Sequence, residues 1–388
     1  MSSVEEEVSR RLRWEMQENT QCVVCKGDMD WPAADSEMLF VNPAYLSLYS
    51  ECQSLWGGGI QALFVKGTPG IGKSCFLDYA LFRLLTEEKT VLYADCPSDC
   101  MYKFYPPSKG GGYELFRGVF DAVTKLDVAS STDVDVVLFD PHENSKETQQ
   151  YTRKHFFGKG ILAAVSPDPE NCKKLFKATA ESQGILYLGT LSLAEAKQMR
   201  SVRYSNSVSE ELLTSRYNNI GGVPRYLFPK LLPNGDDSAL KQVKQKQEKA
   251  LRQAVDQPQV IDGGEVDAAF QHLWSLYFLK PLCNSDGTVD HYNYSIELCG
   301  EDSRARLRDR LMEIEVKSLW ALYENTLDQN GTLKGIRFEA YAHKKILAEG
   351  VAGIAQSLTT TGSGSATRQF TIPASLPKLV LKDNNLGL

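Results

Sequence analysis

The chain has 388 residues, of which 24% are charged and 42% hydrophobic, a composition typical of a globular protein with two or three domains. Its net charge of −6 argues against a surface that coats nucleic acid broadly, although a local basic groove is compatible with it. The sequence has no apolar run long enough for a membrane span and no secretory signal, so we expect a cytoplasmic or nuclear protein without a membrane partner. Nine cysteines without a regular framework fit reduced thiols in such a compartment.

Residues 1–56 are expected to form a segment that precedes the first domain. Its beginning is charged and compatible with a helix, Asn42-Pro43 is a turn signal, and the glycines at 57–59 mark a boundary. Cys22 and Cys25 have the spacing of half a zinc knuckle, but no second pair completes it. We therefore expect small buried side chains at these two positions rather than a zinc site.

The next segment fits the phosphate-binding loop G-x-x-x-x-G-K-[ST]. An apolar run at 63–65 predicts a strand before it, and an apolar run at 75–85 predicts a helix after it. In that setting backbone N–H groups and the helix dipole converge on phosphate oxygens. We expect Lys73 to reach the β- and γ-phosphates and Ser74 to ligate Mg²⁺. The residues predicted to bind the nucleotide here are Gly67, Thr68, Pro69, Gly70, Ile71, Gly72, Lys73, Ser74 and Cys75.

Further apolar runs alternate with helical segments and predict strands over residues 90–94, 134–140, 161–165 and 185–188. This alternation is typical of a parallel α/β sheet. The second of these runs ends in Asp140, as in a Walker B strand whose acid holds Mg²⁺. Glu143, shortly after it, has two interpretations that the sequence leaves open: it orients the attacking water, or it is a solvated loop acid. Ser166 follows the next strand and is predicted to sense the γ-phosphate.

These elements predict an α/β P-loop NTPase core over residues 57–192, with a parallel sheet sandwiched by helices. The class expected is the one with an additional strand between the Walker strands (ASCE, AAA-like). A capping box at Ser192 begins a helix, and residues 193–260 are predicted to form a helical lid. Residues 261–388 are predicted to be mainly helical. The helices expected in these two regions cover 207–217, 238–255, 261–277, 303–323 and 335–349.

Four motifs in this order resemble the Crinkler effectors of oomycetes and fungi and the related retrotransposon hot spot (RHS) proteins of trypanosomes. They are the phosphate loop, Ser166-Pro167, the segment 221–226 and the segment 338–343, and the resemblance spans about residues 60–350. It implies an NTPase, often fused to a nuclease-like domain. It also implies that Pro224 approaches the adenine and that Arg225 senses or neutralises the γ-phosphate. The alternative is a helix that ends at Gly221-Gly222 with Arg225 on the surface.

The chain departs from that family at two points. The targeting segment of secreted Crinklers is absent from this sequence. Glu339 has the position of a nuclease helix acid, but no Asp/Glu-x-Lys triplet follows it, and Glu315-Val316-Lys317 precedes it in a helical pattern. Phosphodiester cleavage needs several carboxylates around Mg²⁺, so we do not expect the chain to cut nucleic acid by itself.

The leading hypothesis is Mg²⁺-dependent ATP binding and hydrolysis, in which Ser74 and Asp140 hold the metal. The residues predicted to carry catalysis are Lys73, Asp140, Glu143, Ser166 and Arg225. A neighbouring subunit of a homo-oligomer would supply a further arginine, for which the candidates are Arg200, Arg203 and Arg216. The alternative is an ATP-gated binding module with little turnover, whose partner is DNA or a nuclear protein.

Overall fold

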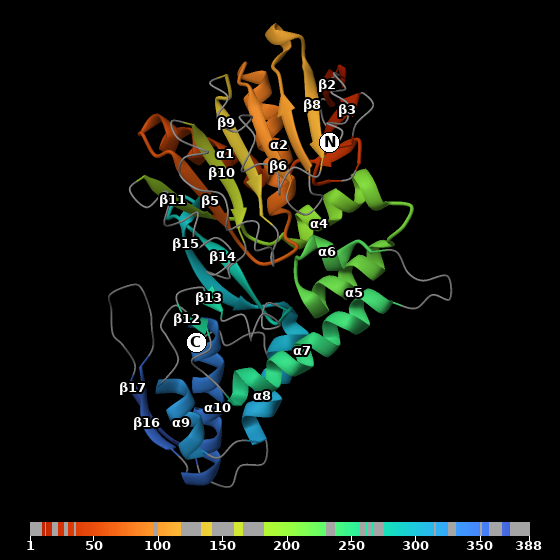
Figure 1. The fold of residues 1–388 in the computed structure, drawn as a ribbon. Coiled ribbons are helices and arrows are strands. Elements are labelled where there is room, and N and C mark those ends of the chain that lie inside the picture. Colours follow the sequence, from red (N-terminus) through yellow and green to blue (C-terminus); the bar gives the residue numbers. More distant parts are fainter. Residues whose placement is uncertain are drawn as a thin grey trace, which may run out of the picture.

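The computed structural model describes the chain from residue 10 to residue 372, with gaps. The described residues are 10–11, 13–17, 22–26, 30–34, 36–95, 100–117, 133–141, 159–165, 182–229, 237–256, 261–262, 265–266, 275–313, 316–324, 331–349, 351–356 and 367–372. A sheet with flanking helices occupies one end of the molecule, and helices with short hairpins occupy the other (Figure 1). Among the described residues, no helix has the length and hydropathy that a membrane span requires.

The sheet has eight strands in the order β1-β8-β7-β6-β9-β10-β5-β11. Five adjacent strands are parallel: β6 (Val91–Asp95), β9 (Val136–Asp140), β10 (Gly160–Val165), β5 (Ala62–Lys66) and β11 (Gln183–Tyr187). Three antiparallel strands extend it: β7 (Cys100–Phe104), β8 (Gly112–Arg117) and β1 (Arg10–Arg11). Because β10 lies between β5 and β9, the sheet has the strand order of a P-loop NTPase with the additional strand, and the predicted fold class is confirmed.

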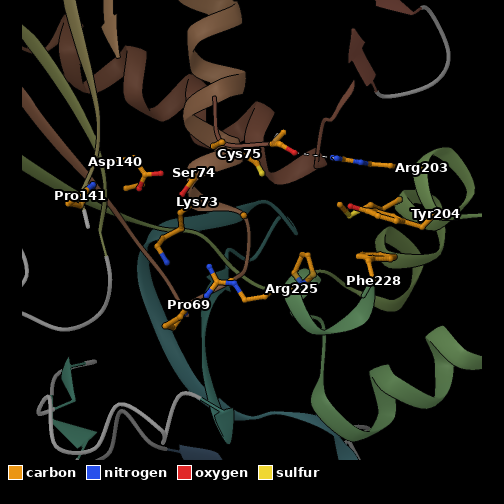
Figure 2. Close-up of a pocket in the computed structure, with 17 residues that line it drawn as sticks. Pro69, Lys73, Ser74, Cys75, Asp140, Pro141, Arg203, Tyr204, Arg225 and Phe228 are labelled. Carbon is orange, nitrogen blue, oxygen red and sulfur yellow. Dashed lines mark hydrogen bonds between the residues drawn. The ribbon is translucent and has the colours of Figure 1, made fainter. Parts of the chain in front are cut away.

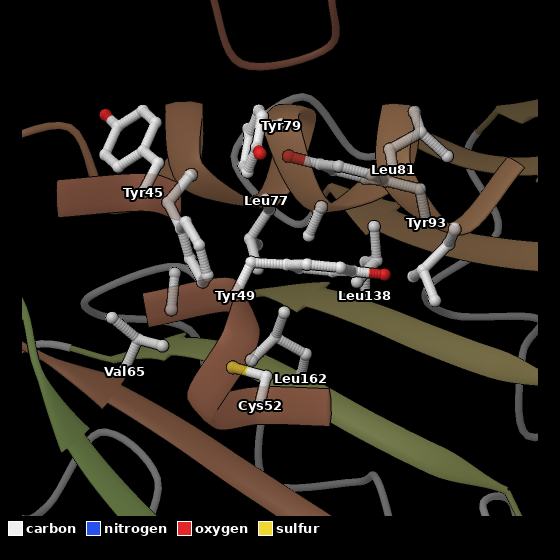
Figure 3. Packing of buried hydrophobic residues seen from close by; sticks show 14 of the residues in the cluster. Tyr45, Tyr49, Cys52, Val65, Leu77, Tyr79, Leu81, Tyr93, Leu138 and Leu162 are labelled. Carbon is white, nitrogen blue, oxygen red and sulfur yellow. The ribbon is translucent and has the colours of Figure 1, made fainter. Parts of the chain in front are cut away.

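Four of the parallel strands, β6, β9, β10 and β5, are apolar over most of their length because both faces of the sheet are buried there. Leu63 and Val65 of β5 pack on the face covered by α1 (Pro43–Gly57) and α2 (Lys73–Thr86), whereas Phe64 points to the opposite face and is equally buried. Figure 3 shows the first of these cores, in which tyrosines of both helices lie above the strands. The four strands predicted between residues 90 and 188 are confirmed.

The amino-terminal segment is a small antiparallel sheet followed by α1. Its strands are β2 (Arg13–Gln17), β3 (Cys22–Lys26) and β4 (Met38–Phe40), so the expectation of a helical start is wrong for residues 13–17. Pairing with β3 holds this charged stretch extended. Cys22 and Cys25 are buried, as expected. The Asn42-Pro43 signal begins α1: the Asn42 side chain accepts a hydrogen bond from the Ala44 N–H, and Pro43 takes the first helical position.

The segment after the sheet, for which a helical lid is predicted and which we call the lid, consists mainly of helices in its described residues. It comprises α4 (Leu193–Met199), a π-helical turn (Arg200–Tyr204), α5 (Glu210–Ile220), α6 (Pro224–Leu227) and α7 (Ser238–Asp256). The predicted capping box is present, since Ser192 accepts from the Glu195 N–H and the Glu195 carboxylate accepts from the Ser192 N–H. α7, the last helix of the lid, runs from beside α5 toward α8 (Figure 1).

The carboxyl-terminal region combines helices with hairpins that the sequence analysis missed. Its helices are α8 (Gly300–Glu313), α9 (Val316–Glu324) and α10 (Gly331–Glu349), so one predicted helix is two and the last is confirmed. The helix predicted over 261–277 is wrong for the described residues of this range, which form β12 (Ile261–Asp262) and β13 (Glu265–Val266) and end where β14 begins. Residues 263–264 and 267–274 lie outside the described residues. β14 (Tyr277–Cys283) pairs with β15 (Val289–Leu298), and β16 (Val351–Gln356) pairs with β17 (Thr367–Ile372).

Candidate functional site

The loop between β5 and α2 depends on its glycines. Gly70 and Gly72 have φ values of 83° and 101°, a left-handed conformation that side chains disfavour. A Cβ at Gly67 would lie 2.6 Å from the Leu188 carbonyl oxygen. Gly72 also accepts a hydrogen bond from the Tyr45 hydroxyl at 2.7 Å and caps the amino terminus of α2. The loop is therefore held in a conformation that directs the amino terminus of α2 toward the space in front of it.

Lys73 is the first residue of α2, and its side chain folds back over this loop. Its ammonium donates hydrogen bonds to the carbonyl oxygens of Gly67 at 2.7 Å and Thr68 at 3.1 Å. The side chains of Thr68 and Ile71 are buried instead: Ile71 joins the core, and the Thr68 hydroxyl accepts a hydrogen bond from the Leu279 N–H of β14. These two predicted binding residues therefore offer only backbone groups to a ligand.

A cavity of about 360 Å³ opens in front of the loop. It is lined by Ala33, Ala34, Pro69, Gly70, Gly72, Lys73, Ser74, Cys75, Asp140, Pro141, Ala164, Met199, Arg203, Tyr204, Pro224, Arg225 and Phe228. Figure 2 shows Lys73, Ser74 and Asp140 at one end of this pocket, Tyr204 and Phe228 at the other, and Arg225 between them. The amino-terminal segment, the sheet and the lid thus all contribute to one site.

The donor set at the first end suits a magnesium ion. The Ser74 hydroxyl and the Asp140 carboxylate both line the cavity, and Mg²⁺ prefers oxygen ligands and keeps several waters. Asp95, which the sequence analysis did not single out, is the direct neighbour of Asp140 across β6 and β9 and is also buried. Cys75, by contrast, is a poor nucleophile, because burial raises the pKa of its thiol to about 12.

The lid touches the loop through α6. The Arg225 N–H donates to the Gly70 carbonyl oxygen at 3.3 Å, and the Arg225 side chain packs over Gly70. Both interpretations of this segment describe part of the geometry: α5 does end at Gly221, where φ is 68°, and Arg225 is exposed, yet Arg225 and Pro224 border the pocket.

An aromatic end of the pocket was not predicted. The rings of Tyr204 and Phe228 stack with centroids 4.4 Å apart at 13°. The guanidinium carbon of Arg203 lies 5.5 Å from the centroid of the Tyr204 ring. The same guanidinium donates hydrogen bonds to the carbonyl oxygens of Met38 and Ala34, both at 3.3 Å. The guanidinium therefore joins the lid to the amino-terminal segment. The two aromatic residues lie in irregular lid segments, where local sequence carries no pattern that would single them out.

The other two candidate arginines are also held within the chain. Arg216 is fully buried, pairs with Asp237 at 2.8 Å and donates to the carbonyl oxygens of Leu227 and Pro229. It is therefore inaccessible to a neighbouring subunit. Arg200 donates to the Val208 carbonyl oxygen at 2.6 Å.

Asp78 supports the amino-terminal wall of the pocket from inside α2. Its carboxylate is fully buried and accepts hydrogen bonds from the N–H groups of Ala33 and Ala34, the shortest at 2.9 Å. Burial raises the pKa of Asp78 well above its usual range, and the nearby charge of Asp140 raises it further.

Two predicted site residues, Glu143 and Ser166, lie outside the described residues. Glu339, the candidate nuclease acid, is exposed on α10 and pairs with Arg308 at 3.1 Å. In the part of the chain that the structure describes, no group of three or more His, Cys, Asp or Glu side chains is arranged to hold a metal ion.

No protein-family model and no curated protein matches the chain. Among solved structures it is similar to domain III of the replication initiation protein DnaA from Thermotoga maritima, with 15% identity and a TM-score of 0.34 over 60% of this chain and 92% of that one. It is also similar to AMPPCP-bound DnaA from Aquifex aeolicus (13% identity, TM-score 0.33, 79% of this chain and 90% of that one). A third similarity is to the RuvB Holliday junction branch migration motor of Thermotoga maritima (13% identity, TM-score 0.29, 81% of this chain and 89% of that one).

Proposed function

We propose that the chain binds ATP together with Mg²⁺ in this pocket and hydrolyses it. The observation that carries the proposal is the meeting of the phosphate loop, Asp140 and the lid residue Arg225 around one cavity, although they are far apart in the sequence. A phosphate loop alone binds anions, whereas a loop facing a strand-end acid and a lid cation has the groups that phosphoryl transfer needs.

Each group has a role that follows from its chemistry. Phosphate oxygens would replace the carbonyls of Gly67 and Thr68 as partners of the Lys73 ammonium. Ser74 and Asp140 would hold Mg²⁺, which neutralises charge on the phosphates. Arg225 would neutralise the γ-phosphate from the lid side. Glu143 remains the candidate to orient the attacking water and Ser166 the candidate to sense the γ-phosphate.

The adenine would extend toward the aromatic end of the pocket, where Tyr204 and Phe228 offer a ring face and Pro224 begins α6. We propose that the chain is an NTPase of the Crinkler and RHS type acting in the cytoplasm or nucleus. The support is the order of its motifs over residues 60–350 and the position of the segment around Arg225 against the phosphate loop.

An ATP-gated binding module is the second candidate, and one observation favours it. Two separate elements bond to the phosphate loop: Arg225 of the lid contacts Gly70, and Leu279 of β14 contacts Thr68. Occupancy of the loop could therefore move both elements without turnover.

Mg²⁺-dependent ATP hydrolysis by the wild type, Lys73→Ala and Asp140→Asn tests the proposal. We expect each variant to lose about 10²-fold or more in rate, since each removes a charge that acts on the phosphates. Lys89→Ala and Asp309→Asn, at exposed positions away from the pocket, are matched controls and should keep the wild-type rate.

The same assay separates the alternatives. A rate per subunit that rises with protein concentration would indicate a catalytic group from a neighbouring subunit. Tight ATP binding without turnover, with or without DNA, would favour the gated module. If neither ATP binding nor hydrolysis is detected, both candidate functions are wrong.

A further inference from the structure

A row of four aromatic rings lies on α9 and α10, at the end of the molecule away from the sheet (Figure 1). We call Trp320, Tyr323, Phe338 and Tyr341 the aromatic row. Ring centroids are 5.2 Å apart for Trp320 and Tyr323, 4.8 Å for Trp320 and Tyr341, and 5.5 Å for Tyr323 and Phe338. These distances make the row continuous. Trp320 is 39% exposed and Phe338 is 47% exposed, so two of its four rings face solvent.

Lysine ammonium groups lie over two rings of the aromatic row, Tyr323 and Tyr341. Lys334 lies 5.4 Å from the Tyr323 ring centroid and Lys345 lies 5.6 Å from that of Tyr341. Lys345 also donates a hydrogen bond to the Tyr341 hydroxyl at 3.1 Å. Lys334, Phe338, Tyr341 and Lys345 follow one another at helical spacing along one side of α10 and span about 16 Å of its axis.

This chemistry fits a nucleic-acid strand better than a protein partner. Protein interfaces are enriched in aromatic residues and arginine but depleted of lysine. Single-stranded nucleic acids, in contrast, are held by rings on which bases stack and by cations close to the backbone phosphates. The acid next to Phe338 in the sequence, Glu339, is paired with Arg308, which reduces its repulsion of a phosphate.

We propose that the aromatic row is a binding platform for single-stranded nucleic acid. About two or three bases stack on Trp320 and Phe338, and the backbone phosphates pass near Lys334 and Lys345. Duplexes are excluded, because the faces of paired bases are already stacked on one another. The platform is separate from the cavity at the phosphate loop and does not depend on ATP.

Fluorescence anisotropy with labelled dT and rU oligonucleotides of about 20 nucleotides tests the proposal on the full chain at low salt. We expect Trp320→Ala and Phe338→Ala each to weaken binding about tenfold, and Trp320→Phe to restore most of the affinity because it keeps a ring. Tyr292→Ala, which removes an exposed aromatic ring of β15, is the matched control and should bind as the wild type does. Thermal unfolding of each variant checks that it is folded.

The platform is supported if the chain binds dT, rU or both, if the two ring deletions reduce this binding, and if Lys73→Ala retains it. The comparison of the two probes shows whether DNA or RNA is preferred. Equal affinity for a duplex of the same length would overturn it. So would the absence of saturable binding by either probe, binding that survives both ring deletions, or association of the row with phospholipid vesicles in place of the oligonucleotides.

Discussion

Asp78 illustrates how one residue determines the shape of the site without lining it. Its buried carboxylate fixes Ala33 and Ala34, and the Ala34 carbonyl oxygen in turn accepts a hydrogen bond from Arg203. The phosphate-loop helix, the amino-terminal segment and the lid are thereby connected through three side-chain to backbone contacts. A buried carboxylate of this kind also makes folding sensitive to pH.

We expect Asp78 to reduce stability as the pH rises. Its folded-state pKa is well above its ordinary value of 3.8, so the folded protein retains a proton that the unfolded chain has released. The free energy of unfolding therefore falls as pH rises from the unfolded pKa through the folded one. Urea unfolding of wild type and Asp78→Asn between about pH 4 and pH 8 measures this contribution. The wild type should lose stability relative to Asp78→Asn as pH increases, and the opposite slope would contradict the assignment.

Tyr204 gives a second prediction at this scale. If the base stacks at the aromatic end of the pocket, Tyr204→Ala should weaken ATP binding about tenfold and leave the binding of inorganic triphosphate unchanged. Tyr204→Phe keeps the ring and serves as the control. Calorimetric titration with both ligands distinguishes loss of stacking from general damage, which would weaken the two ligands equally.

Among the elements, the hairpin of β14 and β15 contacts the phosphate loop and two of its neighbouring elements. Besides the bond from Leu279 to Thr68, it carries His291, whose Nδ1 bonds the Tyr187 carbonyl oxygen at 3.0 Å and whose Nε2 bonds the Ser47 hydroxyl at 2.8 Å. Burial lowers the pKa of His291 and so favours its neutral form. The hairpin is thus attached to the phosphate loop, to β11 and to α1.

We expect Thr68→Val to lower the free energy of unfolding by about 1–3 kcal/mol. The substitution conserves shape but leaves the buried Leu279 N–H without its acceptor. Thr68→Ser keeps the hydroxyl and should lose much less. Denaturant unfolding of the two variants is the measurement, and equal stability would mean that the hairpin does not depend on this bond.

For the whole molecule, the hairpin lies between the sheet and the carboxyl-terminal helices (Figure 1). Tyr187 of β11 and the aliphatic side chains of α8 and α10 belong to the same hydrophobic cluster as Tyr277 and Leu279. The hairpin that contacts the phosphate loop therefore packs in one core with α8 and α10.

Mg²⁺ and ATP at about a hundred times the dissociation constant should stabilise the folded chain by about 2.7 kcal/mol. Because Thr68 contacts β14, we also expect slower amide hydrogen exchange in β14 as well as in the loop. Lys73→Ala should show neither effect. Protection confined to the loop and α2 would mean that the carboxyl-terminal region does not respond to the nucleotide.

The sequence by itself determined the features that depend on neighbours along the chain. The phosphate loop, the strand that ends in Asp140, the capping box at Ser192 and the last helix all follow from local spacing and apolar pattern. The sequence also contains a turn signal for the hairpin of β14 and β15, since Asp286-Gly287 lies between two runs rich in residues that favour strands. Such short-range signals are strong because they reflect hydrogen bonds and turns formed within a few residues.

Only the tertiary structure decided which distant residues share the site. Tyr204 and Phe228 stack, and Arg216 is buried against Asp237, because the helices of the lid pack on one another. Arg203 reaches the amino-terminal segment because the lid lies against it. The sequence does not distinguish an arginine that faces solvent from one that binds a partner or pairs with an internal carboxylate. Its role depends on burial and on contacts between segments far apart in the sequence, and those are properties of the folded chain.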